Sequence, residues 1–523
     1  AYSGVTNFAT RFRKTGLRQE FSESLVERAM LRVSRAGSVV VSRRWFASGA
    51  SFDVVSPVDG TTVVSTVRAD DDVSVAMKFV SASQAQKNGV WSSIRWEDRA
   101  ARIRDFAERV RDDAGEIASI ITAETGKPAT QSRMEVNASA RRVTDLVATC
   151  DRARARMESN SVRASSGSVT EKVTHEPVGV VAHVSAWNYP AFLAVNVLVP
   201  ALLAGNSVLH KPSEYSPGVS ERLRTLLLQS DVPSEVFQVC QGGADVGKAL
   251  VRLQGLGAVA FTGSRVVGTE VATVAARSHT RTVLELGGVD AAYVRPDVAD
   301  VARAAASIAS GAFHNAGQGC CAVERVYVHR DVYDSFVDAF VAEARKYRAA
   351  DPALATTNLG PLTSRGAVER VAAHVDDAVR AGAHVLYRGD APGGGGYFHP
   401  VVVVGGDALR GSQRQRMITA DETFGPVAAV VPVHDDEEAI EAMNDSSYGL
   451  TASVYTADGA VAESILRRLD VGTGYWNACN HPSTNLPWTG RYGSGGGSGG
   501  CTLGEEGYAS FTRPKALCMR SRA

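Results

Sequence analysis

The chain has 523 residues, and its 56 basic and 56 acidic side chains give a formal net charge of zero. This balance argues against a general nucleic-acid binder or a protein held on an anionic membrane, since both usually carry a basic excess. The hydrophobic share is 44% and the charged share 21%, which excludes disorder as the main state and favours roughly two to four structural units.

Seven cysteines are scattered along the chain without a CxxC pair. An odd, sparse set argues against a disulfide framework or a zinc ribbon and favours a reducing compartment, and no metal site is expected. The longest apolar stretch, 191–209, is interrupted by Asn196, Pro200 and Gly205, so no membrane span is expected.

Residues 1–50 differ from the rest, with nine basic residues against three acidic ones and many serines. This composition is typical of a mitochondrial transit peptide, and Arg44-Trp45-Phe46-Ala47-Ser48 resembles a processing site. We therefore expect a targeting segment and a mitochondrial matrix location. The alternative is a basic arm that stays attached to a cytoplasmic protein.

The body begins near Phe52 with two short strands predicted over Phe52–Thr66, around the turn Val58-Asp59-Gly60. The apolar periodicity of Arg95–Glu124 predicts one helix, ended by Gly126-Lys127-Pro128. Ser159–Thr170 is polar between two extended pieces and predicts a protruding hairpin.

After this helix, apolar strand-like runs alternate with helical ones, which predicts an α/β fold with a mostly parallel, doubly wound sheet. The expected strands of a first block are Val178–Val184, Ser207–His210, Val236–Val239, Ala258–Thr262 and Val283–Leu286. A second block begins near Gly288, with strands expected at Arg325–His329, Val401–Val404, Ala428–Val433 and Ala452–Tyr455.

Gly317-Gln318-Gly319-Cys320-Cys321 places a cysteine among small residues, where a substrate can approach its sulfur closely. A thiolate is a strong nucleophile when its pKa is lowered. Taken alone, the segment fits a buried structural cysteine better.

Two further segments follow predicted strands. Leu284-Glu285-Leu286-Gly287-Gly288 puts a carboxylate at a strand end, where α/β sheets bind ligands, although a solvent-facing Glu is the simpler reading of this segment alone. In Ser185-Ala186-Trp187-Asn188-Tyr189-Pro190, the Asn188 amide can donate a hydrogen bond into a site or cap the next helix.

His210-Lys211-Pro212-Ser213-Glu214 and the later Phe261-Thr262-Gly263-Ser264 also lie where strands end. The second leads through a Gly-Ser turn into a predicted helix, an arrangement that suits a phosphate at a helix N-terminus.

Together these segments resemble the aldehyde dehydrogenase superfamily over nearly everything from about Phe52 to Lys515. Their order and spacing agree, from Asn188 through Lys211 and Glu285 to Cys320. Further matching stretches are Glu124-Thr125-Gly126-Lys127-Pro128, Glu422-Thr423-Phe424-Gly425-Pro426-Val427 and Leu486-Pro487-Trp488-Thr489-Gly490.

The resemblance implies a doubly wound, Rossmann-like coenzyme domain over 51–156 and 178–286, and an α/β catalytic domain over 287–490. Residues 157–177 and 491–523 would form a small β oligomerisation arm and C-terminal tail. A homodimer or homotetramer is then expected, acting on a small-molecule aldehyde, with neither nucleic acid nor membrane as a partner.

The resemblance also implies the chemistry, oxidation of an aldehyde to the carboxylic acid. Cys320 matches the nucleophile and Glu285 the general base, whose presence favours hydrolysis over transfer to coenzyme A. The Asn188 side chain and the Cys320 backbone N–H would form the oxyanion hole. The sequence singles out no arginine for a carboxylated substrate, so it does not name the aldehyde.

The same resemblance implies a coenzyme site. Glu214 would hydrogen-bond a free 2′-hydroxyl and repel a 2′-phosphate, which favours NAD over NADP. The residues expected to bind this coenzyme are Trp187, Lys211, Glu214, Gly263, Ser264, Glu422 and Phe424.

The chain departs from the family pattern at Val289, where a lysine is usual, at Ala291, where proline is common, and in a Gly-rich C-terminal run without basic residues. These departures and the basic N-terminus motivate an alternative, a catalytically idle homologue that serves as a structural or assembly subunit.

Overall fold

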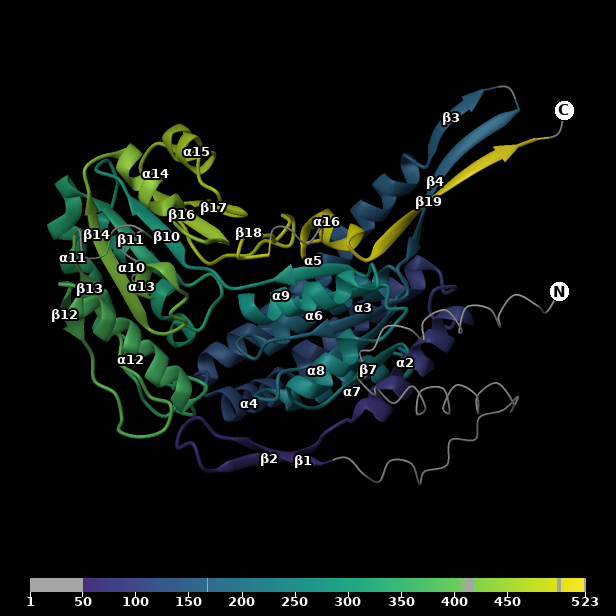
Figure 1. Cartoon of the computed structure of the whole chain (residues 1–523), viewed down its shortest axis with the longest axis horizontal. Helices are drawn as coiled ribbons and strands as arrows, with labels where there is room; N and C mark the ends of the chain where they lie inside the picture. Colours follow the sequence, from purple (N-terminus) through teal and green to yellow (C-terminus); the bar gives the residue numbers. More distant parts are fainter. Residues whose placement is uncertain (1–49, 167, 407–408, 410–416, 496–499, 522–523) are drawn as a thin grey trace, which may run out of the picture. The chain divides into compact units, whose positions relative to one another are not determined.

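The structure is a computed structural model that describes residues 50–166, 168–406, 409, 417–495 and 500–521. Residues 50–523 form one compact unit, whose helices and strands are drawn in Figure 1. The expected targeting segment, 1–50, lies outside the described residues except for Ala50. Among the described helices, none is long and apolar enough to cross a membrane.

The unit opens with the expected pair of strands, β1 (Ser51–Val55) and β2 (Val63–Arg68), which are antiparallel. The prediction of one helix over Arg95–Glu124 is wrong, because the chain forms two helices there, α3 (Trp96–Asp112) and α4 (Ala114–Thr125). Asp113 separates them with φ −92° and ψ 9°, and its carboxylate accepts two hydrogen bonds of 2.5 Å from Arg222. The apolar periodicity continues across this break, so the sequence does not reveal it.

A five-stranded sheet forms the centre of the first expected α/β block. All its neighbouring strands are parallel, and β6 is buried along its whole length, as expected where helices cover both faces. Its order is β7 (Phe237–Val239), β6 (Ser207–Lys211), β5 (Val180–Val184), β8 (Ala258–Thr262), β9 (Arg281–Glu285). The segments that follow these strands therefore all leave the sheet at the carboxyl ends of its strands.

A seven-stranded sheet forms the second block. Six of its strands are parallel, and β12 at one edge is antiparallel to β13. The order is β12 (His384–Arg388), β13 (Val401–Val404), β14 (Val427–Val433), β11 (Val323–His329), β10 (Asp290–Val294), β16 (Thr451–Tyr455), β17 (Thr473–Trp476). Only Leu286–Val289 separates β9 of the first sheet from β10 of the second, so this link joins the two.

Helices accompany both sheets, and two long ones, α2 and α5, were not expected from the sequence. In the first block they are α2 (Asp72–Lys87), α5 (Ala129–Ser159), α6 (Pro190–Leu203), α7 (Pro217–Gln229), α8 (Ala244–Val251) and α9 (Arg265–Ala276). In the second they are α10 (Val301–Phe313), α11 (Arg330–Ala344), α12 (Arg365–Arg380), α13 (Met417–Ala420), α14 (Asp436–Asn444) and α15 (Gly459–Leu466). The short α16 (Gly504–Ala509) packs near α5.

The predicted hairpin is formed by β3 (Val162–Ser166) and β4 (Val169–Pro177). The C-terminal strand β19 (Thr512–Arg520) pairs antiparallel with β4 over nine residues, so the hairpin becomes a three-stranded sheet (Figure 1). Two short strands, β15 (Tyr448–Gly449) and β18 (Arg491–Tyr492), form a separate pair.

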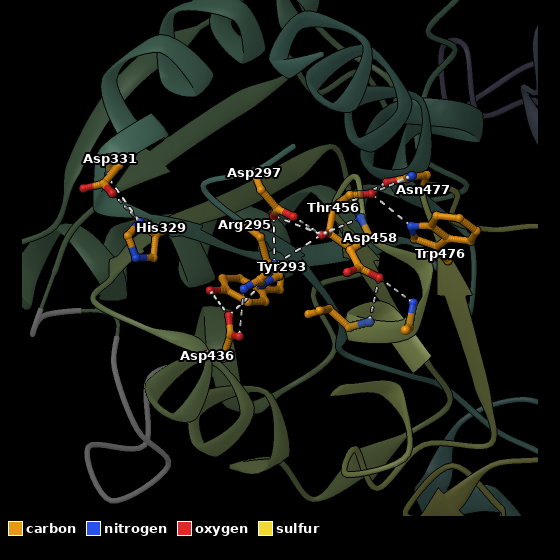
Figure 2. Close-up of polar contacts among 12 residues, drawn as sticks. Tyr293, Arg295, Asp297, His329, Asp331, Asp436, Thr456, Asp458, Trp476 and Asn477 are labelled. Carbon is orange, nitrogen blue, oxygen red and sulfur yellow. Dashed lines mark hydrogen bonds and ion pairs between the residues drawn. The ribbon is translucent and has the colours of Figure 1, made fainter. Parts of the chain in front are cut away.

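A polar network lies at the carboxyl ends of β10 and β16, as Figure 2 shows. Arg295 makes ion pairs with Asp297 at 2.9 Å and with Asp436 at 2.8 Å, and Tyr293 donates to Asp436 at 2.8 Å. Thr456 donates to Asp297. Arg295, Asp297 and Asp436 are paired with one another, so we assign this network a structural role.

Candidate active site

The loop that carries Cys320 connects α10 with β11 and has an unusual backbone. Asn315, Ala316 and Gly317 all have positive φ, at 52°, 54° and 70°. A Cβ on Gly317 would lie 2.1 Å from the carbonyl oxygen of Gly425, so only glycine fits there. This close packing fixes the path of the chain just before Cys320.

The two adjacent cysteines differ in exposure. Cys320 is half-buried, whereas Cys321 is buried and its Sγ donates to Asn480 Oδ1 at 2.8 Å. A hydrogen bond with Cys320, together with burial, raises the pKa of the Cys321 thiol well above its usual range. Of the two, Cys320 is therefore the thiol open to a substrate.

Asn188, in the loop between β5 and α6, reaches the cysteine loop. Its Nδ2 donates to the backbone oxygen of Gln318 at 3.1 Å, two residues before Cys320. Asn315 Nδ2 in turn donates to the backbone oxygen of Asn188 at 3.1 Å. The Asn188 side chain is buried, and its Oδ1 has no hydrogen-bond partner among the described residues.

Two buried ionic side chains, Lys127 and Glu135, bind the backbone of the Asn188 loop and of the first turn of α6. Lys127 Nζ donates to the Asn188 carbonyl at 2.7 Å, lies 3.8 Å from the centre of the Tyr189 ring and forms an ion pair with Glu135. Glu135 Oε1 accepts a hydrogen bond of 2.9 Å from the backbone N–H of Ala191, in the first turn of α6. Burial lowers the pKa of Lys127, and the charge of Glu135 opposes this shift.

Sequence reasoning assigned no site role to either residue of this pair. Lys127 lies in a stretch that matches the family pattern without a role of its own, and Glu135 is one of many acidic residues on a helix. A lysine between glycine and proline at a helix end was the available signal for the first, and the sequence carries none for the second.

Glu285 ends β9, beside the link to the second sheet. Its Oε1 accepts hydrogen bonds from Thr502 N at 3.0 Å and Thr502 Oγ1 at 2.9 Å, while Oε2 is buried without a partner among the described residues. Burial raises the pKa of Glu285 to about 8. Three residues later, a Cβ on Gly288 would lie 2.7 Å from the Cys320 carbonyl oxygen, so the Glu285 segment and the cysteine loop are in contact.

Lys211 and Ser264, like Glu285, lie at the carboxyl ends of strands in the five-stranded sheet. Lys211 is buried at the end of β6, and its Nζ lies 3.3 Å from Glu214 Oε2. Burial lowers the pKa of Lys211, and Glu214 opposes this shift. Ser264 caps α9 by accepting a hydrogen bond from Val267 N, and the preceding Gly263 donates to the Glu285 carbonyl at 3.1 Å.

Glu422 and Phe424 approach from the second sheet. Glu422 Oε1 accepts a hydrogen bond of 3.2 Å from Gly288 N, and burial raises the pKa of Glu422 to about 8. The Phe424 ring packs edge-on against Trp187, with ring centres 5.7 Å apart. Glu324, which the sequence did not single out, accepts a backbone hydrogen bond from Phe424 at 2.9 Å and so fixes its position.

The structure thus gathers the expected residues into two connected groups. Asn188 and Cys320 meet through the Gln318 carbonyl, and Glu285, Gly263 and Glu422 meet around the link between the sheets. Lys211 and Glu214 form a separate pair at the carboxyl end of β6. The described contacts place no direct hydrogen bond between Glu285 and Cys320.

The departures from the family pattern are accommodated in the core. Val289 and Ala291 are both buried, and the Val289 carbonyl accepts a hydrogen bond of 2.9 Å from Arg325. Asp290, between them, accepts hydrogen bonds from the backbone and hydroxyl of Thr451.

Comparisons with known proteins give one answer. Residues 45–517 match the aldehyde dehydrogenase family. A protein named "Aldehyde dehydrogenase, mitochondrial" from Leishmania tarentolae is 32% identical over 482 residues, which are 91% of this chain and 93% of the relative.

Solved structures are equally similar. The gamma-glutamyl-gamma-aminobutyraldehyde dehydrogenase of Burkholderia cenocepacia superposes with a TM-score of 0.84 at 32% identity, covering 90% of this chain and 94% of its own. The P. syringae indole-3-acetaldehyde dehydrogenase, solved in complex with NAD+, has a TM-score of 0.85 at 30% identity, covering 91% and 94%. The chain therefore belongs to the aldehyde dehydrogenase family.

Proposed function

We propose that the protein oxidises an aldehyde to the carboxylic acid with NAD+, with Cys320 as the nucleophile. The position of Asn188 carries this proposal. Its buried amide is fixed on the carbonyl of Gln318, beside the one half-buried thiol of the loop. An amide donor held next to a nucleophile is what an oxyanion requires.

The first step uses the thiol and the amide together. The Cys320 thiolate attacks the carbonyl carbon of the aldehyde, and the developing oxyanion accepts hydrogen bonds from Asn188 Nδ2 and the Cys320 backbone N–H. Each such donor is worth about 3 kcal/mol in other oxyanion holes. Lys127 keeps the Asn188 backbone in place during this change of charge.

The side chains at the carboxyl ends of the strands suit the binding of a dinucleotide. Lys211 is a buried ammonium beside a single carboxylate, Ser264 and the first turn of α9 offer a phosphate site, and Glu422 is a buried carboxylate able to accept a ribose hydroxyl. When bound, NAD+ supplies the acceptor for the hydride. Glu214, at the end of the Lys211 segment, favours NAD+ over NADP+ because its carboxylate would repel a 2′-phosphate.

The second half of the reaction needs a base. After hydride loss the acyl group is a thioester of Cys320, and a water molecule deprotonated by Glu285 Oε2 would release the acid. This oxygen is buried and has no hydrogen-bond partner among the described residues, so it could accept a hydrogen bond from a water that enters the site. Its raised pKa, about 8, makes it a stronger base than an exposed glutamate.

Assembly and location follow as further parts of the proposal. β3 and β19 are the two edges of the three-stranded sheet, and an unpaired edge favours pairing with another copy, so we propose a homo-oligomer joined there. The basic composition of residues 1–50 supports import into mitochondria.

The decisive experiment measures NADH formation by the purified chain with NAD+ and a panel of aldehydes. Cys320→Ala should abolish turnover, and the matched control Cys518→Ser, at an exposed thiol on β19, should not change it. Equal activity of Cys320→Ala and the unaltered chain would refute the proposal. No NADH from the folded chain with any aldehyde would instead support an idle assembly subunit.

A further inference from the structure

Arg142 on α5, near the cysteine loop, has no ion-pair partner among the described residues. Its Nη1 donates to Asn196 Oδ1 at 3.0 Å, and its Nη2 donates to the carbonyl of Pro482 at 3.1 Å. The guanidinium carbon lies 4.4 Å from the centre of the Phe192 ring. The side chain is half-buried, so a ligand can still reach it.

Both hydrogen-bond acceptors of Arg142 are neutral. Among the residues that the structure describes, no carboxylate lies within ion-pair distance of its guanidinium. Burial lowers the pKa of Arg142 to about 10, and the charges of Asp145 and Glu135 oppose this shift without reaching ion-pair distance. Arg295 is the opposite case, because two aspartates flank it in the network of Figure 2.

A guanidinium has five N–H donors in a planar fork, and the described contacts of Arg142 use two of them. Burying a charge without a partner is costly, so such a group is usually matched by an anion. The remaining donors and the unbalanced charge suit a carboxylate, which arginine binds through two parallel hydrogen bonds.

Contacts connect Arg142 to the cysteine loop on the side of Phe192. The Phe192 ring packs on Tyr189, with centres 6.2 Å apart, and the Tyr189 ring lies 3.9 Å from the position of a Cβ on Gly319, the neighbour of Cys320.

A second connection runs through one short loop. Asn480 accepts the hydrogen bond of Cys321, and the carbonyl of Pro482, two residues on, accepts that of Arg142. The residues proposed to hold NAD+ come from the carboxyl ends of the strands in the five-stranded sheet and from residues 422–424. Arg142, Phe192 and Asn480 are not among these residues, which leaves their part of the site for the aldehyde.

We propose that Arg142 binds a carboxylate on the aldehyde substrate, so that the enzyme prefers ω-oxo carboxylates to uncharged aldehydes. This inference rests on the proposed function, because it names the substrate class of the same site. It gives the half-buried guanidinium an anion at ion-pair distance, which the described residues do not provide. The aldehyde carbon would reach Cys320 while the far end of the substrate is held at α5.

The test compares ω-oxo carboxylates of increasing chain length with their uncharged methyl esters, as kcat/KM in NADH formation with the full chain. A charge-assisted pair predicts that at least one acid is preferred over its ester by about tenfold to hundredfold. Arg142→Met should lower this preference by about tenfold or more, mainly through a higher KM for the acid. Arg142→Lys, which keeps the charge and loses the fork, should retain part of it.

Arg141→Met is the matched control, since Arg141 is the exposed neighbour on the same helix and its loss should leave the preference unchanged. Equal turnover of acids and esters by the unaltered chain would overturn the proposal. So would an equal loss for both in Arg142→Met, the result expected if Arg142 only holds the loop at Pro482.

A second measurement does not need turnover. Dicarboxylates, the products of these acids, should slow the alkylation of Cys320 by iodoacetamide in the unaltered chain, and much less in Arg142→Met. If no aldehyde is oxidised but this protection depends on Arg142, the dehydrogenase proposal fails and the carboxylate site stands. If aldehydes are oxidised and dicarboxylates do not protect Cys320, the carboxylate site fails alone.

Discussion

The Nζ of Lys127 donates a hydrogen bond of 2.7 Å to the backbone carbonyl of Asn188, on which the proposed oxyanion hole depends. The same ammonium is ion-paired with Glu135, and Glu135 accepts the backbone N–H of Ala191 at 2.9 Å. The start of α6 and the Asn188 loop are thus fixed by one buried pair, whose two side chains are each 1% exposed. The hydrogen bonds of the pair go to the Asn188 loop and the start of α6, so we expect the pair to position Asn188.

Lys127→Met should destabilise the fold and reduce catalysis. Removing one partner leaves Glu135 buried without a counter-ion, which typically costs about 3 to 5 kcal/mol. Denaturant unfolding would measure this loss, and kcat under conditions where the variant remains folded should fall because the Asn188 amide loses its position. Restoration of stability by the double variant Lys127→Met/Glu135→Gln, without restoration of kcat, would separate the two effects.

The control for this pair is exposed. Glu463 on α15 and Arg467, just after its end, form an ion pair of 2.6 Å, with Arg467 76% and Glu463 65% exposed. Surface pairs contribute about 0 to 1 kcal/mol, so Arg467→Met should change the free energy of unfolding by no more than that and leave kcat alone. A cost for Lys127→Met as small as for Arg467→Met would contradict the assigned role.

Glu285 predicts a pH dependence of the hydrolytic step. Its pKa is raised to about 8, so near neutral pH most of the carboxyl is protonated and cannot accept a proton from water. The ionised fraction grows about tenfold per pH unit below that value. Where hydrolysis limits turnover, kcat should rise with pH and level off above about 8. Glu285→Gln should remove this rise in kcat. The initial burst of NADH, which comes from the first turnover before hydrolysis, should remain.

Thr502→Val tests the cause of that pKa. The Thr502 hydroxyl donates to Glu285 Oε1 at 2.9 Å, and this hydrogen bond favours the ionised carboxylate. Without it the pKa should rise further, so the midpoint of the kcat profile should move to higher pH. A midpoint that moves to lower pH, or stays in place, would show that another group titrates.

Glu214→Gln should weaken the discrimination between coenzymes. The carboxylate lies 3.3 Å from Lys211 Nζ, and as an amide it would no longer repel a 2′-phosphate. The ratio of kcat/KM for NAD+ to that for NADP+ should fall by about tenfold, mostly through a lower KM for NADP+. Glu235→Gln, an exposed residue just before β7, is the matched control. An unchanged ratio in Glu214→Gln would assign the discrimination to other residues.

The sequence predicted the alternation of strands and helices well, because apolar runs and helical periodicity record which faces are buried. Most expected strands agree with the structure to within one or two residues, as β13 and β8 do without any shift. The break at Asp113 was missed because it leaves the apolar period intact. The long α5 was missed because it buries polar residues, among them Gln131, Ser132 and Glu135, which a hydrophobic pattern does not register.

The polar contacts of the site were beyond the sequence for a different reason. Arg142 meets an amide 54 residues away and a carbonyl 340 residues away, so no local pattern distinguishes it from the exposed Arg141 beside it. Cys320, Glu285 and Asn188 were singled out because the order and spacing of their segments resemble the aldehyde dehydrogenase superfamily. Taken alone, the cysteine and glutamate segments favoured other readings. Thr502, 217 residues after Glu285, could not be, because only the folded C-terminal segment brings them together.

Gly317→Ala should disturb the cysteine loop far more than an alanine at another positive-φ glycine. Gly317 has φ +70° and an added Cβ would lie 2.1 Å from the Gly425 carbonyl oxygen, whereas Gly60 has φ +72° and open space around its Cβ position. Gly60→Ala therefore measures the backbone strain alone, about 1 to 2 kcal/mol. Gly317→Ala adds a clash with the backbone of another segment, which must move the loop and displace the Gln318 carbonyl that Asn188 holds. We expect a larger loss of unfolding free energy and slower alkylation of Cys320 by iodoacetamide in Gly317→Ala only. Equal effects of the two alanines on both measurements would mean that the loop yields without moving Cys320.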